Sequence, residues 1–215
     1  MQRVQDFEFP PVRLRRVVTG IAQENCYLVL AGERALLVDP GDDAALILSE
    51  VRREGARVEA VLLTHAHFDH VGAVQEVREA LGVPVLLHRE AREQYARAGE
   101  LATAWGLPFR QPEAPDGDLE AGDLPFEGFG LRALFTPGHA PGHVALASSA
   151  GFVLAGDALF KGSIGRTDLP GSDHATLLES IRRELLALPG GTVVFPGHGP
   201  ETTVLAEARS NPFLV

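Results

Sequence analysis

The stretch from Thr64 to His70 reads Thr-His-Ala-His-Phe-Asp-His and constrains this chain more than any other part of the sequence. The apolar run Val58–Leu63 precedes it and predicts a buried strand. Four side chains able to bind a metal ion fall within six consecutive positions: His65, His67, Asp69 and His70. A strand that ends in such a motif points several side chains at one spot, and imidazoles and carboxylates are ligands of zinc and other first-row metals. A histidine cluster on a surface loop is the alternative.

Further candidate ligands stand later in the chain, where apolar runs end beside Gly or Pro. They are His139 in Thr-Pro-Gly-His, Asp157 in Ala-Gly-Asp, and His198 in Phe-Pro-Gly-His. Functional groups gather on loops at strand ends because the scaffold holds those positions rigid. Together with the first motif they give five histidines and two aspartates, which is enough for two metal ions. This accumulation argues against the surface-loop alternative.

Apolar periodicity and turn residues predict alternating strands and helices. Strands are expected at Val12–Val18, Asn25–Leu30, Ala35–Val38, Val58–Leu63, Val83–Leu87, Phe126–Phe135, Val144–Ala147, Phe152–Leu154 and Thr192–Phe195. Helices are expected from Asp42 or Asp43 to about Glu54, at Val71–Leu81 with Asp69 as its cap, at Glu90–Leu101, at Ala175–Leu188 after a Ser172 or Asp173 cap, and at Glu201–Arg209. Thr103–Gly122 is expected to be an irregular loop. Hairpins and strand runs in each half indicate two packed sheets with helices outside, rather than a doubly wound sheet.

Length and composition exclude several classes of protein. The 215 residues predict one domain, residues 1–215. Asp6 and Glu8 interrupt Met1–Pro10, so this segment lacks the apolar core of a signal peptide. The apolar runs of the sequence are too short to span a membrane, so a cytoplasmic protein is expected. A single cysteine excludes a disulfide framework or a cysteine metal cluster. The net charge of -10 argues against non-specific binding of nucleic acid.

Three residues near the motifs each leave two interpretations open. Cys26 fits a small buried hydrophobic residue better than a reactive thiol. His143 fits a structural or hydrogen-bonding role beside the site rather than metal ligation. Asp39, in Val-Asp-Pro-Gly, either orients a ligand histidine or closes the turn beside Pro40 and Gly41.

Three polar side chains outside the predicted ligand set are also candidates for a functional role. His88 and His174 fit structural or solvent-facing positions. Arg166 follows Asp157 closely and is the candidate to meet an anionic part of a substrate. Its alternative role is to brace the loop by pairing with Asp168 or Asp173.

The motifs resemble those of the metallo-β-lactamase superfamily, and their fuller wording is similar to that of its glyoxalase II-like hydrolases. The motifs that carry this resemblance are Thr64–His70, Thr136–His139, Gly-Asp-Ala-Leu-Phe at Gly156–Phe160 and Pro-Gly-His-Gly at Pro196–Gly199. It implies an α/β fold, the four-layer αββα sandwich. It also implies that His65, His67 and His139 hold one metal, that Asp69, His70 and His198 hold the other, and that Asp157 bridges them.

The resemblance further implies a hydrolase that cleaves a thioester such as S-lactoylglutathione. Two divalent ions, zinc first with iron or manganese as alternatives, would hold a bridging hydroxide that attacks the carbonyl. Asp69 and Asp157 are the candidate catalytic residues. The expected partner is a small-molecule thioester, not nucleic acid or a membrane, and the protein is expected to be a monomer or homodimer.

The sequence departs from full-length glyoxalase II in two ways. Few residues follow His198, so we expect that family's C-terminal helical domain to be absent, and Arg166-Thr167-Asp168 replaces its Lys-Phe-Tyr stretch. Short bacterial glyoxalase II-like hydrolases fit better. Gly165–Asp168 is also similar to persulfide dioxygenases, in which one iron is held by the counterparts of His65, His139 and Asp157 and glutathione persulfide is oxidised. That enzyme is the alternative function, and a non-catalytic metal-binding module is a third.

Overall fold

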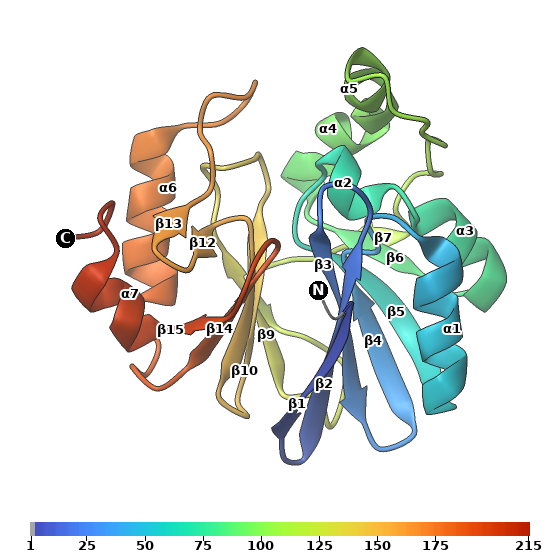
Figure 1. Ribbon diagram of the computed structural model, residues 1–215, viewed down its shortest axis with the longest axis horizontal. Coiled ribbons are helices and arrows are strands. Elements are labelled where there is room, and N and C mark those ends of the chain that lie inside the picture. The colour runs from blue at the N-terminus through green and yellow to red at the C-terminus, as the bar shows by residue number, and fades with distance from the viewer. Residues whose placement is uncertain (1–2) are drawn as a thin grey trace. The chain divides into compact units, whose positions relative to one another are not determined.

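The computed structural model describes residues 3–215. They form two compact units, unit 1 up to Leu119 and unit 2 over Glu120–Val215. Within the described residues, each unit is built around one large sheet, of seven strands in unit 1 and six in unit 2 (Figure 1). The expectation of a single domain over residues 1–215 stays a prediction. None of the helices in residues 3–215 has the length and apolar character needed to cross a membrane.

The sheet of unit 1 changes from antiparallel to parallel pairing at its fourth strand. Its strands lie in chain order: β1 (Val4–Phe9), β2 (Val12–Thr19), β3 (Glu24–Ala31), β4 (Arg34–Val38), β5 (Arg57–Leu63), β6 (Val85–Leu87) and β7 (Gly117–Asp118). The first four form an antiparallel meander, whereas β4, β5, β6 and β7 pair in parallel. Since parallel strands end at the same edge of a sheet, the residues after β4 and β5 are brought together.

Apolar side chains from the sheet and its helices form the core of unit 1. Helix α1 (Ala44–Glu54) connects β4 to β5 and packs against α3 (Val74–Leu81) on one face of the sheet (Figure 1). Leu28 and Val61 of the sheet and Ile47 of α1 are among the residues buried there. Burying such a side chain contributes roughly 1.5–3 kcal/mol to folding, so this packing fixes the strand ends that carry the first motif.

The sheet of unit 2 is mostly antiparallel with one parallel pair. Its order is β15 (Thr202–Thr203), β14 (Val193–Pro196), β11 (Phe152–Gly156), β10 (Val144–Ser148), β9 (Leu131–Phe135) and β8 (Gly122–Asp123). Strands β11 and β14 are parallel, and β9 runs in their direction because both β9 and β11 pair antiparallel with β10. The three loops that carry the later candidate ligands therefore leave the same edge of this sheet.

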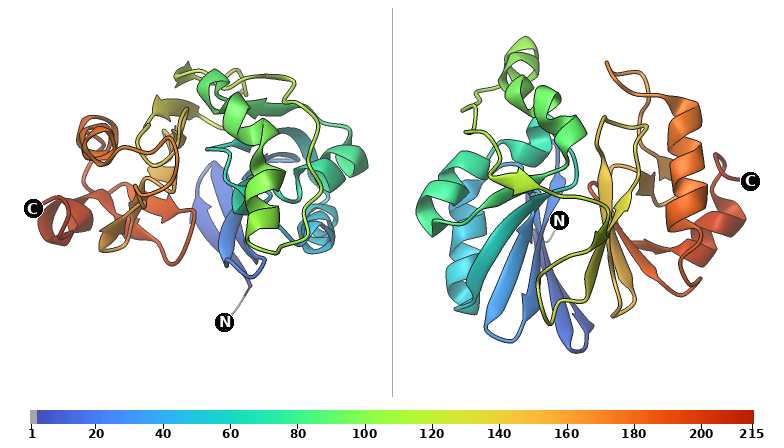
Figure 2. Two further views of the ribbon diagram at one scale, coloured as in Figure 1. Left: turned by 90° about the horizontal axis from the view of Figure 1, so that it is seen from above. Right: turned by 180° about the vertical axis from the view of Figure 1, so that it is seen from behind.

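Helices cover one face of the unit 2 sheet. Helix α6 (His174–Ser180), its π-helical continuation η2 (Ile181–Leu185) and α7 (Val204–Ser210) lie side by side there (Figures 1 and 2). Leu177 and Ile181 pack with Val153 and Val204 in one buried cluster. A small hairpin, β12 (Leu159–Phe160) with β13 (Ser163–Ile164), follows β11 directly.

The helix predicted at Val71–Leu81 is two helices in the structure. Helix α2 (Phe68–Val71) ends at Gly72, and α3 begins after Ala73. The backbone N–H of Ala73 donates to the carbonyl of Pro40 at 3.0 Å, which takes it out of the helical pattern. The prediction that Asp69 caps this helix is wrong, because His67 occupies the N-cap of α2 and Asp69 lies inside its first turn.

Other boundaries also differ from the predictions. The strand expected at Phe126–Phe135 is confined to β9, and Gly128 and Gly130 before it have φ values of 83° and 58°, which interrupt an extended chain. The expected helix at Glu90–Leu101 is divided into η1 (Arg89–Ala91), α4 (Arg92–Ala96) and α5 (Ala98–Ala104). The expected loop Thr103–Gly122 contains β7. Asp173 is confirmed as the cap of α6, since its carboxylate accepts from Thr176 N–H at 2.7 Å.

Candidate metal centre

Three buried imidazoles crowd together at the end of β5 in unit 1. His65 and His70 are fully buried and His67 is 5 % exposed. The Nε2 atom of His65 lies 3.1 Å from Nδ1 of His67, and the ring centres of His65 and His70 are 4.1 Å apart. Two nitrogens that are each about 2.1 Å from one ion at tetrahedral angles lie about 3.4 Å apart, so this spacing fits a shared metal. Asp69 follows in α2, and we call these four residues the N-terminal ligand cluster.

Asp39, at the end of β4, orients one member of this cluster. It is 2 % exposed and has a φ of 48°, a left-handed conformation that costs a residue with a side chain roughly 1–3 kcal/mol. Its carboxylate accepts from the N–H of Thr64 at 2.7 Å and from the Thr64 hydroxyl at 2.6 Å. The same carboxylate lies 3.0 Å from Nδ1 of His70. A proton on Nδ1 satisfies this contact and leaves Nε2 of His70 as the nitrogen that can bind a metal.

Asp39 therefore contacts and orients His70, a predicted ligand, which matches one of its two predicted roles. The ligand atoms of Asp39, His65 and His70 all lie within 4.8 Å of one another. The parallel pairing of β4 with β5 makes this contact, because it sets the residue after one strand beside those after the other.

Glu24 is a buried acid near this cluster that the sequence analysis missed. It is 1 % exposed at the start of β3, and its Oε1 lies 3.9 Å from Nδ1 of His70. The Thr19 hydroxyl donates to its other oxygen at 2.7 Å. Burial raises the pKa of Glu24 well above its usual value, although the nearby His70 opposes this. Its only signal in the sequence is an acidic residue that opens an apolar strand.

Gly41 lets the backbone beneath the N-terminal ligand cluster pack closely. A Cβ atom at this position would overlap the carbonyl oxygen of Asp69 and would lie 2.8 Å from a carboxylate oxygen of Glu24. Glycine is therefore required here for close approach of two backbone segments. This packing fixes Asp69 at the edge of the sheet.

In unit 2 two histidines flank one carboxylate oxygen. Nε2 of His139 and Nε2 of His198 each lie 3.6 Å from Oδ2 of Asp157. This distance is too long for a good hydrogen bond and close to the separation of two ligands of one ion. A carboxylate oxygen at this distance from two separate imidazoles suits a bridge between two metals. We call His139, Asp157 and His198 the C-terminal ligand cluster.

Hydrogen bonds to the backbone hold this cluster in place. Nδ1 of His139 lies 2.9 Å from the carbonyl oxygen of Arg166, which fixes the proton on Nδ1 and turns Nε2 toward Asp157. His143 is fully buried, and its Nε2 accepts from the N–H of Asp157 at 3.1 Å. Its Nδ1 then carries the proton and donates to the hydroxyl of Thr136, 2.8 Å away. His143 thus holds the backbone of Asp157, as its predicted hydrogen-bonding role requires.

Gly165 also lies against this cluster. A Cβ atom here would overlap the carbonyl oxygen of Asp157 and would lie 3.0 Å from the ring of His139. The chain returns past both ligands at this point, so a larger residue would displace one of them.

Arg166 is tied to Asp168 in the structure. Its Nε and one terminal nitrogen donate to the two carboxylate oxygens at 2.7 and 2.9 Å. The pair is solvent-exposed and lowers the pKa of Asp168. The geometry matches the bracing role, and the substrate contact of Arg166 stays a prediction.

The remaining sequence candidates occupy structural positions. Cys26 is fully buried, and burial raises the pKa of its thiol well above the usual value, which makes it a core residue rather than a nucleophile. His88 caps η1 by accepting from the N–H of Glu90 at 3.3 Å. His174 is exposed at the start of α6, with Nδ1 3.3 Å from the Thr167 hydroxyl.

The sequence of the chain is similar to a known protein family and to individual relatives. The sequence model of the Metallo-beta-lactamase superfamily matches residues 19–198. A protein of Bacillus subtilis described as "Probable metallo-hydrolase YqgX" is 43% identical over 206 residues, which cover 94% of this chain and 98% of that protein. "Hydroxyacylglutathione hydrolase GloC" of Haemophilus influenzae is 38% identical over 197 residues, which cover 89% of this chain and 93% of that protein.

Solved structures give the same picture. TTHA1623 in a di-iron-bound form superimposes with a TM-score of 0.88 at 49% identity, over 93% of this chain and 99% of that one. BLEG-1 B3 metallo-beta-lactamase gives a TM-score of 0.89 at 38% identity, over 94% and 99% of the two chains. ETHE1 from Myxococcus xanthus gives 0.76 at 25% identity, over 93% and 83%.

Proposed function

The chain belongs to the metallo-beta-lactamase superfamily, and from this premise we propose that it is a binuclear metal-dependent thioester hydrolase of the glyoxalase II type. It has the metallo-beta-lactamase fold, a mixed α/β fold with several sheets, and it is a metallo-hydrolase with a histidine-rich metal site. The finer assignment of substrate and metal count is our proposal. Likeness to GloC over most of both chains supports it.

The proposed centre combines the two ligand clusters. His65, His67 and His139 would hold one ion, Asp69, His70 and His198 would hold the other, and Asp157 would bridge them. The observation that carries this assignment is the placement of His139 and His198 at equal distances, 3.6 Å, from the same oxygen of Asp157. The di-iron form of TTHA1623 supports a count of two ions in a protein 49% identical. Zinc, iron and manganese all suit such a donor set.

The residues around the clusters would prepare the site for hydrolysis. Asp39 and the carbonyl of Arg166 keep the protons of His70 and His139 on Nδ1, so that both Nε2 atoms are available as ligands. His143 holds the backbone N–H of Asp157, and Gly165 lets the chain pass close to the Asp157 carbonyl and the ring of His139. The metal ions, when bound, would lower the pKa of a water and polarise the carbonyl under attack. A thiolate leaves without a strong general acid, because the pKa of a free thiol is only about 8.5.

A mononuclear iron persulfide dioxygenase is the second candidate. The sequence Gly165–Asp168 favours it, and the ETHE1 neighbour at 25% identity supports keeping it in the test. The ligands it requires, His65, His139 and Asp157, are a subset of those proposed here. The two functions differ in metal count and in the need for oxygen.

Metal analysis combined with two assays separates these functions. We expect about two ions per chain and hydrolysis of S-lactoylglutathione by the purified protein. Asp157→Ala should lose at least one ion and activity, because it removes the shared ligand, whereas the exposed Asp123→Ala should retain both. One iron per chain with oxygen uptake on addition of glutathione persulfide would contradict the proposal. So would full metal loading of Asp157→Ala, or hydrolysis of a β-lactam with no thioester turnover.

A further inference from the structure

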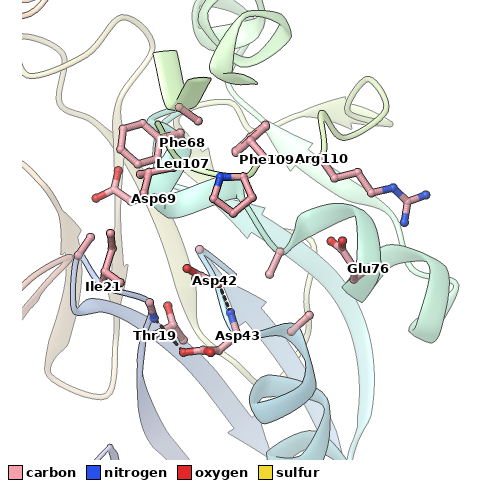
Figure 3. A pocket seen from close by; sticks show the side chains of 18 of the residues that line it. Thr19, Ile21, Asp42, Asp43, Phe68, Asp69, Glu76, Leu107, Phe109 and Arg110 are labelled. Atoms are coloured by element: carbon pink, nitrogen blue, oxygen red, sulfur yellow. Dashed lines mark hydrogen bonds between the residues drawn. The ribbon is translucent and has the colours of Figure 1, made fainter. Parts of the chain in front are cut away.

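Unit 1 contains a pocket of about 670 Å³ beside Asp69 (Figure 3). Four separate segments line it: the turn between β2 and β3, the residues that open α1, helix α2 with the start of α3, and the segment after α5. The volume lies within the roughly 300–1,000 Å³ that is typical of small-molecule sites. A three-carbon lactoyl group would fill only a small part of it.

Apolar side chains form much of the wall. Phe68 of α2, Leu107 and Phe109 line one side, and Ile21 of the β2–β3 turn lines another (Figure 3). Ile21 is 80% exposed, which is unusual for a large aliphatic side chain and leaves it available to cover a ligand. Trp105 lies beside this wall, with its ring centre 6.0 Å from that of Phe68 and the two ring planes tilted by 51°.

Acidic groups surround the apolar wall. Asp42, Asp43, Asp69 and Glu76 line the pocket, whereas Arg110 is the one basic residue among its lining residues. Arg110 is already bound to Glu79 through two hydrogen bonds of 2.9 and 2.5 Å. The N–H of Gly20 donates to Asp43 and lowers its pKa, and Arg3 pairs with the same carboxylate and offsets its charge. A negatively charged ligand group in this pocket would be repelled.

The N-terminus of α1 also opens into the pocket at Ala44 and Ala45, and its partial positive charge would by itself favour an anion. The carboxylates of Asp42 and Asp43 stand directly before it and offset that charge. Asp42 in addition accepts from the N–H of Asp43 at 2.6 Å. Arg3 pairs with Asp43 and a bound metal would offset the charge of Asp69, so the acidic character of the pocket rests on Asp42 and Glu76.

We propose that this pocket binds the acyl arm of the thioester, and that this arm is an uncharged, mainly apolar group longer than lactoyl. The inference rests on the proposed function, because Asp69 is both a lining residue and a proposed metal ligand, so an ester held at the metals has this pocket beside it. The thiol half is excluded as the occupant by its charge. Glutathione, with two carboxylates and one ammonium group, and coenzyme A, with its phosphates, both carry a net negative charge that would meet the carboxylates of Asp42 and Glu76.

Binding of simple probes to the metal-loaded protein tests the pocket without any turnover. Hexanamide should bind at least about tenfold more tightly than hexanesulfonate, an anion of equal chain length that is a poor metal ligand, as followed by ligand-observed NMR and by the fluorescence of Trp105, the single tryptophan. Ala45→Phe should weaken hexanamide binding about tenfold by filling the pocket. Ala80→Phe, at an exposed position of α3 outside the pocket, should not. Asp42→Asn should reduce the ratio of hexanamide affinity to hexanesulfonate affinity, because it removes a negative charge from the pocket.

Hydrolysis of thioesters of one uncharged thiol, N-acetylcysteamine, tests the same inference in the reaction. The kcat/KM for the hexanoyl ester should exceed that for the acetyl ester and be at least about tenfold above that for the adipoyl ester, which ends in a carboxylate. Ala45→Phe should reduce the hexanoyl-to-acetyl ratio, and Ala80→Phe should leave it unchanged. Equal or better turnover of the adipoyl ester would overturn the acyl-pocket inference while leaving the hydrolase intact.

The two experiments keep the inference distinct from the proposed function. Absence of turnover of every thioester would overturn the hydrolase and with it the acyl role of the pocket, whatever the probes do. Turnover with no measurable hexanamide binding, or with equal binding of the sulfonate, would overturn the pocket alone. Selective hexanamide binding that Ala45→Phe weakens, together with the expected order of esters, supports both.

Discussion

At the scale of single residues, the site depends on side chains that hydrogen-bond to the proposed ligands and so set their orientation and protonation. Asp39 sits in a left-handed conformation and contacts both Thr64 and His70, so its cost in backbone strain is offset by three hydrogen bonds. His143 performs the corresponding task for the backbone of Asp157. Neither residue needs to touch a metal. Under the proposed function, their effect is to leave Nε2 of His70 and the carboxylate of Asp157 available as ligands.

We expect Asp39→Asn to reduce metal affinity by about 10–100-fold while the protein stays folded. The amide oxygen of asparagine is needed to accept from the N–H of Thr64, so its amide nitrogen faces Nδ1 of His70 and cannot accept from it. The proton then moves to Nε2, the nitrogen that would bind the ion. Competition with a chelating dye measures the affinity, and circular dichroism checks the fold. Asp123→Asn, at an exposed position in unit 2, is the matched control and should behave as wild type. An unchanged affinity in Asp39→Asn would remove the orienting role.

At the scale of elements, a buried charge network connects two strands to a helix in unit 1. The side chain of Arg15, on β2, is only 3% exposed and contacts Asp6 of β1 at 2.7 Å. It also contacts Glu50 and Glu54 of α1 at 2.9 and 2.5 Å. Strand β1 was not predicted from the sequence, and this network together with its pairing to β2 explains why it forms. Such a network is costly to break on one side, because the remaining charges stay desolvated.

We expect Arg15→Met to lower the free energy of unfolding by about 2–3 kcal/mol, less than for a fully buried pair because Asp6 is partly exposed. The hydrogen bond from Arg15 lowers the pKa of Asp6, despite partial desolvation. The contribution of Asp6 is therefore present above its unfolded pKa of about 3.9 and is lost as the pH falls through the lower folded value. Urea denaturation should show a lower free energy of unfolding for Asp6→Asn than for the wild type at pH 7. The difference between the two proteins should be smaller at pH 3. A constant difference would contradict this assignment.

The accuracy of the sequence predictions at this scale followed the range of the interactions involved. Strands such as β3 and β5 were predicted to within one or two residues, because a continuous apolar run marks a buried strand. The division of the Val71–Leu81 helix was missed, because it depends on a hydrogen bond from Ala73 to Pro40, far away in sequence. The helix after Asp173 was predicted as one α-helix, yet its second half is π-helical, with Leu186 N–H donating to Ile181 carbonyl at 2.9 Å.

At the scale of the whole molecule, the proposed ligands are divided between the two units. Unit 1 supplies His65, His67, Asp69 and His70, and unit 2 supplies the C-terminal ligand cluster. Under the proposed function, metal binding would therefore link the stability of one unit to that of the other. A ligand that binds only the folded state raises its stability by mass action.

We expect removal of metal by a chelator to lower the Tm by about 5–10 °C when free metal was present at about 100 times its Kd. The underlying stabilisation is about 2.7 kcal/mol, and 1 kcal/mol shifts the Tm of a chain of this size by about 2–4 °C. If the seven ligands share one centre, calorimetry should record one transition that moves as a whole. Asp157→Ala should respond less to the chelator. Two transitions, with only one sensitive to metal, would contradict a shared centre.

The sequence by itself determined the superfamily and placed the predicted ligands at strand ends, because these follow from local spacing and from the apolar runs that precede them. It also indicated that His143 hydrogen-bonds rather than ligates. Only the tertiary structure decided between the two predicted roles of Asp39. It also placed Glu24 in a buried position beside His70 and formed the pocket around Phe68 from four separate segments. Each of these depends on which strands pair in parallel and which backbones approach closely, and such contacts join residues that no local pattern connects.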